Sequence, residues 1–372
     1  MVIACVIGPG RASAQVSVEI TPPELDDGLA QVETLLAAEV NAAAAEVTDL
    51  VNALLEKPRA LRAVADATVA ASSLRPHPGP GHATRTAPDP GPGGRRDYYL
   101  GIGSAAGVAA ETLRPNAVQE TVDDFEESDD PYLGAAANPL LVSFSFPAAR
   151  LLPGLRFHTA VGYLTTTVSE AEVTGLSLAT SAEYPVVEEA ALGTYVDFAG
   201  VSATAGLGFL RNEIATEISP GTVRQTFTLD PDGQDAPIFA QEVTVEVRPE
   251  VEAALETRVY TLSVGAVTGI RFLDFLGISV GGTAELAAGG TSLQLSADEP
   301  ITLIGPLTEL VRDDSESRLV VSGSTDGVEP SLLQLSTFTA LTWRVSSYRV
   351  SLPVSWRSNS GLAVGLFWGV TF

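Results

Sequence analysis

The sequence is poor in cysteine, in lysine and in aromatic residues, and the shortage of cysteine excludes two kinds of site. Cys5 is the only cysteine among 372 residues, so an internal disulfide and a cysteine-based metal site are both excluded. Lys57 is the only lysine, and arginine supplies the other bases. With a net charge of −25, the chain lacks the basic surface that phosphate recognition needs, which argues against nucleic acid as a partner.

The sequence also lacks any run of 18 or more uninterrupted apolar residues, although 45% of its residues are hydrophobic. A transmembrane helix needs about 20 consecutive apolar residues, so this class of membrane protein is excluded. Each strand of a transmembrane β-barrel shows only about ten residues of alternating hydrophobicity, so this second class stays open.

The last twelve residues, 361–372, alternate between two kinds of side chain. Large apolar residues occupy every second position back from the C-terminus, and mostly small or polar residues occupy the others. This period of two predicts a strand whose two faces meet different solvents. The residues of the apolar face are Leu362, Val364, Leu366, Trp368, Val370 and Phe372.

A strand that ends the chain on Phe372 resembles the closing strand of bacterial outer-membrane β-barrel proteins. In that family, a terminal Phe with hydrophobic residues at alternate positions before it is the barrel-assembly signal. The resemblance implies the outer membrane of a Gram-negative-type bacterium, with membrane lipid and the barrel-assembly machinery as partners. Phe367 stands where the family usually has glycine. Asn138-Pro139 also weakly resembles a motif of the FadL-type fatty-acid transporter family, but lies farther along the chain.

The same alternation recurs from Asp97 onward, with a polar or small second face in each case. We predict an all-β fold, an antiparallel transmembrane β-barrel of about 12 strands (roughly 10–14) formed by residues 97–372. The barrel must close because lipid cannot satisfy an open sheet edge. The alternating segments include 142–146, 155–163, 176–184, 201–209 and 243–247.

Two short loops set the register of the last three strands: a turn at Ser346-Ser347 and residues 358–360. A slip of one residue would move every apolar side chain to the opposite face of the sheet. Pro353 cannot donate to a ladder, so we expect a bulge or a local break there. The predicted pairs are Val345 with Tyr348, Trp343 with Val350, Leu341 with Leu352, Trp356 with Leu362, Val354 with Val364, Leu352 with Leu366 and Val350 with Trp368. Aromatic residues near the strand ends, placed as in an interfacial girdle, are Trp343, Tyr348, Trp356 and Phe372.

This register also sets Arg344 opposite Arg349 on the face that turns away from lipid. Like charges in a cross-strand pair are unfavourable unless nearby acidic side chains compensate them. Acids on the same kind of face elsewhere are Glu183, Glu242 and Glu246, and we expect all five residues to line the pore. The arginines could line one wall of the lumen and the glutamates the opposite wall. This arrangement would create a transverse electric field across the lumen, and in that respect the barrel resembles diffusion porins. Alternatively, they pair directly and plug the barrel.

The first 96 residues carry no comparable alternation. Residues 1–14 read as a signal peptide, since an A-x-A site at Ala12–Ala14 follows an apolar stretch. The missing basic n-region indicates a truncated segment or a misplaced start codon. Val2–Cys5 resembles a lipobox, so lipidation is the alternative, and either interpretation implies export.

Residues 22–74 form a predicted helical extension. An apolar stripe with spacings of three and four runs from Leu25 to Leu54, Pro58 breaks it, and a second helix follows from about Arg59 to Ser72. The preferred interpretation is a periplasmic helical hairpin on the barrel mouth. A lumen plug and a coiled coil that forms a homo-oligomer are the alternatives. Residues 75–96, rich in Pro and Gly, are a predicted linker, and acidic segments such as 120–130 are predicted solvated loops.

No motif supports an enzyme, a cofactor or a metal site. Residues 277–281 match G-x-S-x-G, but a nucleophile elbow needs a later histidine, and none follows His158. Residues 101–107 miss the spacing of a dinucleotide-binding loop, and residues 230–235 miss the EF-hand pattern. His158 is the only histidine of the barrel region, and we predict that it lies in the lumen with its hydrogen bonds satisfied by neighbouring residues.

The first functional hypothesis is therefore an outer-membrane β-barrel channel or transporter for small solutes, including hydrophobic ones. The alternative is a closed structural or surface-interaction barrel without transport activity.

Overall fold

The computed structural model describes residues 3–4, 14–21, 37–38, 41–42, 45, 48–49, 52, 55, 58–74, 98–110, 133–168, 171–218, 223–229, 241–247, 250–273, 275–304, 317–325, 327–358 and 361–372. The predictions for the linker at 75–96, for the acidic segments and for most of the first helix lie outside these residues.

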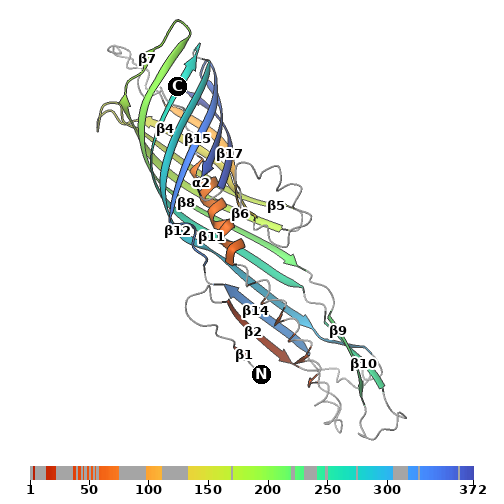
Figure 1. Ribbon diagram of the computed structural model, residues 1–372. Helices are drawn as coiled ribbons and strands as arrows, with labels where there is room; N and C mark the ends of the chain where they lie inside the picture. The colour runs from red at the N-terminus through yellow and green to blue at the C-terminus, as the bar shows by residue number, and fades with distance from the viewer. Residues whose placement is uncertain are drawn as a thin grey trace.

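Ten antiparallel strands close into a ring (Figure 1). Neighbours follow the order β12, β11, β8, β6, β5, β4, β3, β17, β16 and β15, and β15 returns to β12. The predicted all-β barrel is confirmed, with a strand number at the lower limit of the expected range. The bounds are β3 (Tyr99–Ala110), β4 (Leu133–Pro147), β5 (Arg156–Val168), β6 (Ala171–Val187), β8 (Val196–Ile218), β11 (Val251–Phe272), β12 (Leu276–Pro300), β15 (Leu333–Val345), β16 (Tyr348–Arg357) and β17 (Gly361–Thr371).

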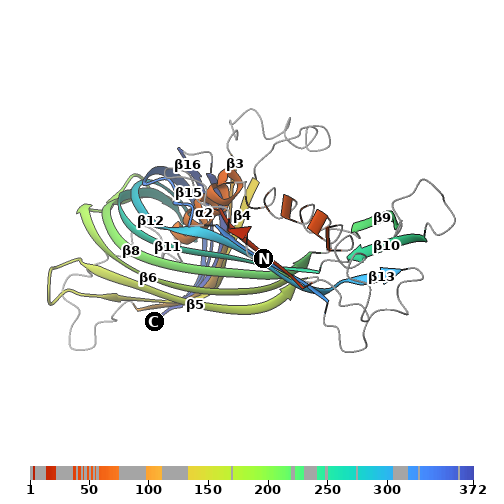
Figure 2. The same ribbon diagram turned by 90° about the horizontal axis from the view of Figure 1, so that it is seen from below.

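At one end the sheet continues beyond the ring. Residues 276–286 of β12 pair with β15, whereas residues 294–300 of the same strand pair with β14 (Arg318–Thr325). β2 (Ala14–Thr21) pairs with β14, and the two-residue β1 (Ile3–Ala4) pairs with β2. We call β2, β14, residues 251–258 of β11 and residues 290–300 of β12 the extension sheet (Figure 2).

The remaining strands lie off the ring. β9 (Val223–Leu229), β10 (Gln241–Val247) and β13 (Thr302–Ile304) form a separate three-stranded sheet. The short β7 (Ala190–Ala191) pairs with β8. The three-stranded sheet lies beside the extension sheet, away from the ring (Figure 2).

The predicted register of the last three strands is confirmed. Val345 pairs with Tyr348 and Trp356 with Leu362, and of the other predicted pairs all but Leu352 with Leu366 are present in the ladders. The ladder between β16 and β17 is interrupted at Leu352 and Pro353 and resumes at Val354 without a shift. Because proline has no N–H to donate, the local break falls where its ring interrupts the ladder.

Along the ring strands, most large apolar side chains point outward and most inward side chains are small or polar, although Leu141 and Phe367 also point inward. On β4, Val142 is 50% exposed and Phe144 39%, whereas Ser143 and Ser145 are buried. The outer surface of the ring is therefore apolar and exposed, and the inner surface is formed mainly by small and polar side chains.

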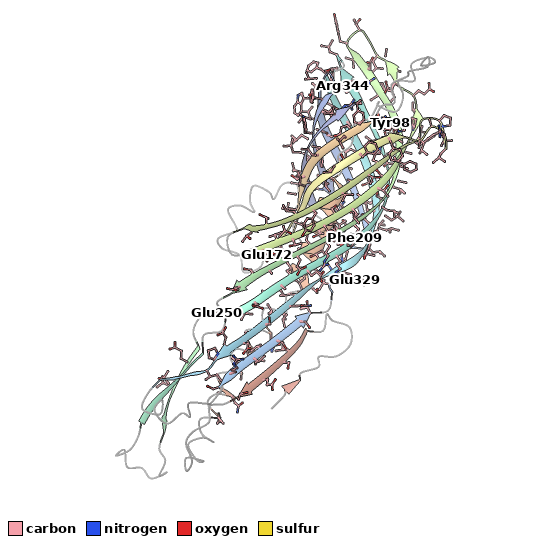
Figure 3. All side chains as sticks on the ribbon, turned by 180° about the vertical axis from the view of Figure 1, so that it is seen from behind. Tyr98, Glu172, Phe209, Glu250, Glu329 and Arg344 are labelled. Carbon is pink, nitrogen blue, oxygen red and sulfur yellow. The ribbon has the colours of Figure 1, made fainter. Side chains whose placement is uncertain are left out.

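Aromatic residues border this apolar surface at the end where the ring begins and closes. The backbone of Tyr98 exchanges two hydrogen bonds of 3.0 Å with that of Phe372, and the Tyr98 ring stacks on Phe144 and on Phe372. We call this the terminal end and the opposite one the extension end. Figure 3 shows Tyr98 and Arg344 near the terminal end and Glu250 toward the extension.

Helix α2 (Pro58–Ser73) matches the predicted second helix and lies within the ring (Figure 1). It contacts β3, β4, β17, β12, β11 and β8, which are strands from around the ring. In the described residues, no helix combines the length and the apolar character needed to cross a membrane.

Candidate functional site

Small residues let α2 lie close against the inner wall of the barrel. A Cβ atom added at Gly107 of β3 would come within 2.7 Å of the backbone nitrogen of Ala71, so the backbone of the helix touches that of the strand. Ala70 packs in one buried cluster with Leu141 and Phe367 from the wall. Residues of α2 between 65 and 71 are almost completely buried, which shows that the helix fills this part of the lumen.

Asp66 joins α2 to the start of β15. Its carboxylate accepts hydrogen bonds from the backbone nitrogen of Ser331 at 2.9 Å, from the Ser331 hydroxyl at 3.1 Å and from the Gln334 amide at 3.0 Å. A buried carboxylate is stable only with such donors. These three bonds therefore hold the helix at one position in the lumen.

Gln334 connects this contact with a buried ion pair. The Arg357 guanidinium donates to the side-chain oxygen of Gln334 and lies 2.5 Å from the Glu285 carboxylate. The exposed fractions of the Arg357 and Glu285 side chains are 0% and 3%. We call Asp66, Gln334, Arg357 and Glu285 the buried network, which links α2 to β15, β16 and β12.

Beyond the C-terminal end of α2 the lumen holds a cavity of about 120 Å³, with Leu74 at its boundary. No lysine or arginine side chain appears among its described lining residues. Hydroxyl groups can donate and accept, so this wall suits water or a small polar solute. Six strands each contribute at least one hydroxyl to the wall, namely Ser181, Thr204, Ser263, Ser279, Thr342 and Ser351.

Arg344 and Arg349 lie near the terminal end of the lumen and are cross-strand neighbours, as the sequence places them. Arg349 is 4% exposed. Arg344 is only half-buried, and its Nε donates a hydrogen bond of 3.3 Å to the carbonyl of Ser346.

Glu183 of β6 also faces the lumen. It lies opposite Arg156 in the register of β5 and β6, and its carboxylate is 3.1 Å from Nε2 of His158. β6 and β16 stand five strands apart in the ring of ten, so Glu183 and Arg349 belong to opposite walls.

The other ring nitrogen of His158, Nδ1, is 2.7 Å from the Ser145 hydroxyl. A Ser, a His and a Glu are also the residue types of a hydrolytic triad, but a nucleophile must be reachable by its substrate. Ser145 is 0% exposed and therefore out of reach of a substrate. The contacts with Ser145 and Glu183 instead supply the hydrogen-bond partners of His158 inside the lumen.

Glu242 and Glu246 lie on β10, in the three-stranded sheet outside the ring. They do not line the lumen with Glu183. The alternation that suggested a barrel strand is the same in any two-faced strand, which is why the sequence could not separate β10 from the ring.

The residues of the predicted assembly strand all lie on the outer face of β17, between half-buried and exposed. The intervening Phe367 points inward and is 1% exposed. Glycine at position 103 of the adjacent β3 leaves room for its ring, since a Cβ atom there would collide with it. The outward residues are Leu362, Val364, Leu366, Trp368, Val370 and, at the C-terminus, Phe372.

Sequence reasoning did not single out Asp66, Gln334, Arg357 or Glu285. The sequence did carry one sign that this helix is buried. Residues 63–71 of α2 are small or apolar on nearly every side of the helix, which is typical of a fully buried helix. The partners of Asp66 come from more than 260 positions later in the chain, and nothing local marks them.

Within the part of the chain that the structure describes, no group of three or more His, Cys, Asp or Glu side chains could hold a metal ion.

Residues 11–372 match a family model described as Lsa36-like, and the chain therefore belongs to this family. No curated protein matches the sequence.

Solved structures to which the chain is similar include the translocator domain of the autotransporter NalP from Neisseria meningitidis, at 11% identity and a TM-score of 0.30, covering 75% of this chain and 89% of that one. The Pseudomonas putida toluene transporter TodX is 10% identical with a TM-score of 0.23, covering 84% and 96%. The monoaromatic hydrocarbon channel CymD is 10% identical with a TM-score of 0.22, covering 75% and 89%. These values are too low to transfer a function.

Proposed function

We propose that this member of the Lsa36-like family is an outer-membrane channel for small solutes that helix α2 keeps closed. The observation that carries the proposal is the buried position of α2 inside a ring with a polar inner wall and an apolar, exposed outer wall.

The membrane location is supported by the outer wall. Residues 276–286 of β12 span ten residue steps, about 33 Å along the strand, and a tilt of 35–45° reduces this to about 23–27 Å along the membrane normal. An apolar band of about 25 Å is typical of outer-membrane barrels. Membrane lipid is then the partner of this wall, and the barrel-assembly machinery of a Gram-negative-type bacterium would recognise the outward face of β17.

Opening requires α2 to move. The wall around the helix leaves little room beside it, since backbone contacts occur at Gly107 and the buried network holds Asp66. The cavity beyond Leu74 is lined by hydroxyl groups together with apolar side chains such as Val267 and Phe338, so its wall admits both polar and hydrophobic small solutes. The proposal includes no enzymatic activity.

A disulfide that locks α2 to the wall tests the proposal. A Cβ atom at Gly361 would lie 3.7 Å from the Cβ of Ala70, which is within the range for a disulfide. The variant carries A70C and G361C together with C5S, so that no other cysteine interferes, and D66A, which removes the acceptor that holds the helix. Conductance in planar bilayers is measured before and after reduction.

We expect the D66A background to conduct, oxidation of the cysteine pair to lower the conductance at least tenfold, and reduction to restore it. The matched control carries A70S and G361S and should not respond to oxidation. Conductance that oxidation leaves unchanged would show that solutes do not need α2 to move. The absence of conductance in every variant would contradict the channel.

The second candidate function is a closed structural or surface-interaction barrel. It is favoured by the extension sheet, which β11 and β12 continue from the ring as a layer outside the apolar band. Liposome swelling separates the two candidates, because D66A vesicles that exclude all solutes support the closed barrel.

A further inference from the structure

We infer that the chain passes through its own barrel, so that β2 and the extension sheet lie on the cell surface while Tyr98 and Phe372 face the periplasm. The inference rests on the proposed membrane location but not on conduction.

The terminal end is defined by the residues where the barrel begins and closes. Tyr98 and Phe372 exchange backbone hydrogen bonds of 3.0 Å, and the backbone nitrogen of Thr371 donates to the carbonyl of Ser347 at 2.8 Å. The first and last strands of the ring and the β15–β16 turn therefore share one end.

The segment before α2 lies at the opposite end. β2 pairs along its whole length with β14, from Ala14 opposite Thr325 to Thr21 opposite Arg318. On its other edge, β14 pairs with residues 294–300 of β12, which have already left the ring. Figure 1 accordingly shows the N-terminus near the extension and the C-terminus near the opposite end.

Helix α2 is oriented from the extension end toward the terminal end. Asp66 binds Ser331 and Gln334, next to the extension end of β15. Leu74, at the other end of the helix, borders the cavity that reaches Thr342 and Ser351, closer to the terminal end.

A continuous chain must join these two ends. β2 precedes α2 at the extension end, and β3 follows it from the terminal end. Since α2 lies inside the ring with this orientation, the covalent path from β2 to β3 goes through the lumen and not around the outside.

The lengths of the connections assign the two ends to the two sides of the membrane. Outer-membrane barrels have short periplasmic turns and longer extracellular loops. At the terminal end, the four connections are residues 148–155, 188–195, 273–275 and 346–347, and none is longer than eight residues. At the extension end, residues 169–170 and 358–360 are short connections, but residues 111–132, 219–250 and 301–332 are each longer than any connection of the terminal end. The extension end is therefore the extracellular one.

The outward face of the strands agrees with this assignment. Beyond the apolar band it carries ion pairs such as Arg211 with Glu256 at 2.6 Å and Arg318 with Asp298 at 3.3 Å. Ion pairs that water can reach suit a solvated surface and are costly in a hydrocarbon core.

Single-cysteine labelling of intact cells tests the inference. In a C5S background, S17C on β2, S322C on β14 and S347C in the turn at the terminal end each place one thiol at an exposed position. A membrane-impermeant maleimide is added to intact and to lysed cells. Heat-modifiable migration of each variant in the outer-membrane fraction controls for assembly.

We expect S17C and S322C to react in intact cells, and S347C to react at least tenfold less until the cells are lysed. Labelling of S347C alone in intact cells would reverse the orientation and overturn the inference. Labelling of S322C without S17C would show that the N-terminal segment is not threaded, and labelling of none would show that the extension is not at the surface. A chain that never migrates as a heat-modifiable barrel contradicts the proposed membrane location instead.

Discussion

β12 passes through two surroundings, and its outward residues change with them. In the ring, its outward side chains are apolar and exposed, as at Val280 and Leu286, which are 50% and 47% exposed. In the extension sheet, the corresponding positions hold Gln294, Ser296 and Asp298. The ladder between β11 and β12 runs through both parts without a register shift, whereas the other neighbour of β12 changes from β15 to β14.

The adjacent strands change at a similar level. The rings of Phe209 on β8 and Tyr260 on β11 lie 5.0 Å apart, and the next outward positions on these strands are Arg211 and Arg258. Aromatic residues at the limit of an apolar band are typical of the interface between lipid and water. In the proposed membrane location, β8 and β11 leave the membrane without interrupting the hydrogen-bond ladder between them.

The largest expected effect on the free energy of unfolding comes from breaking an ion pair in the lumen, compared with breaking an ion pair on the extension sheet. Arg357→Ala leaves Glu285 and Gln334 buried without their partner, and we expect a loss of about 3–5 kcal/mol in the free energy of unfolding. Arg318→Ala removes a pair whose side chains are 56% and 55% exposed, and should cost at most about 1 kcal/mol. Denaturant unfolding in lipid vesicles measures both.

Equal losses for the two variants would show that the buried network is solvated like the extension. The double variant R357M/E285L provides a control, because replacing both partners of a buried pair by apolar residues is often nearly neutral.

A smaller effect is expected when the same charge is placed at two positions on β12. Val280→Arg puts an arginine near the middle of the apolar band, where it should cost about 2–4 kcal/mol. Gln294→Arg puts it on the exposed face of the extension sheet, where surface substitutions stay within about 0.5 kcal/mol. The amount of heat-modifiable barrel and the denaturant midpoint are the readouts, and comparable destabilisation by both would contradict a membrane boundary between them.

The sequence predicted the ring where its signals are local. The two-residue turn at Ser346-Ser347 and the loop of residues 358–360 were sufficient to predict the register of β15, β16 and β17, because the hydrophobic pattern permits only one pairing. Pro353 marked the break in the ladder for the same reason, since its missing donor is a property of the residue itself.

Other features depend on positions far apart in the chain. The alternation of Glu242 and Glu246 with valines is that of a barrel strand, yet β10 belongs to another sheet, because periodicity reports two different faces and not the strand's partners. Asp66 looks like any polar residue of a helix until Ser331 and Gln334 come into contact with it. His158 was predicted to be satisfied in the lumen, but only the register of β4, β5 and β6 supplies Ser145 and Glu183 as its partners.

The account rests on β12 leaving the membrane between Leu286 and Gln294. Spin labels at single cysteines in place of Val280, Leu286, Gln294 and Asp298, in C5S protein reconstituted in vesicles, measure this directly. Collisions with lipid-soluble oxygen should dominate at the first two positions, and collisions with a water-soluble nickel complex at the last two. A label at position 294 that is as shielded from nickel as the label at position 280 would contradict the account.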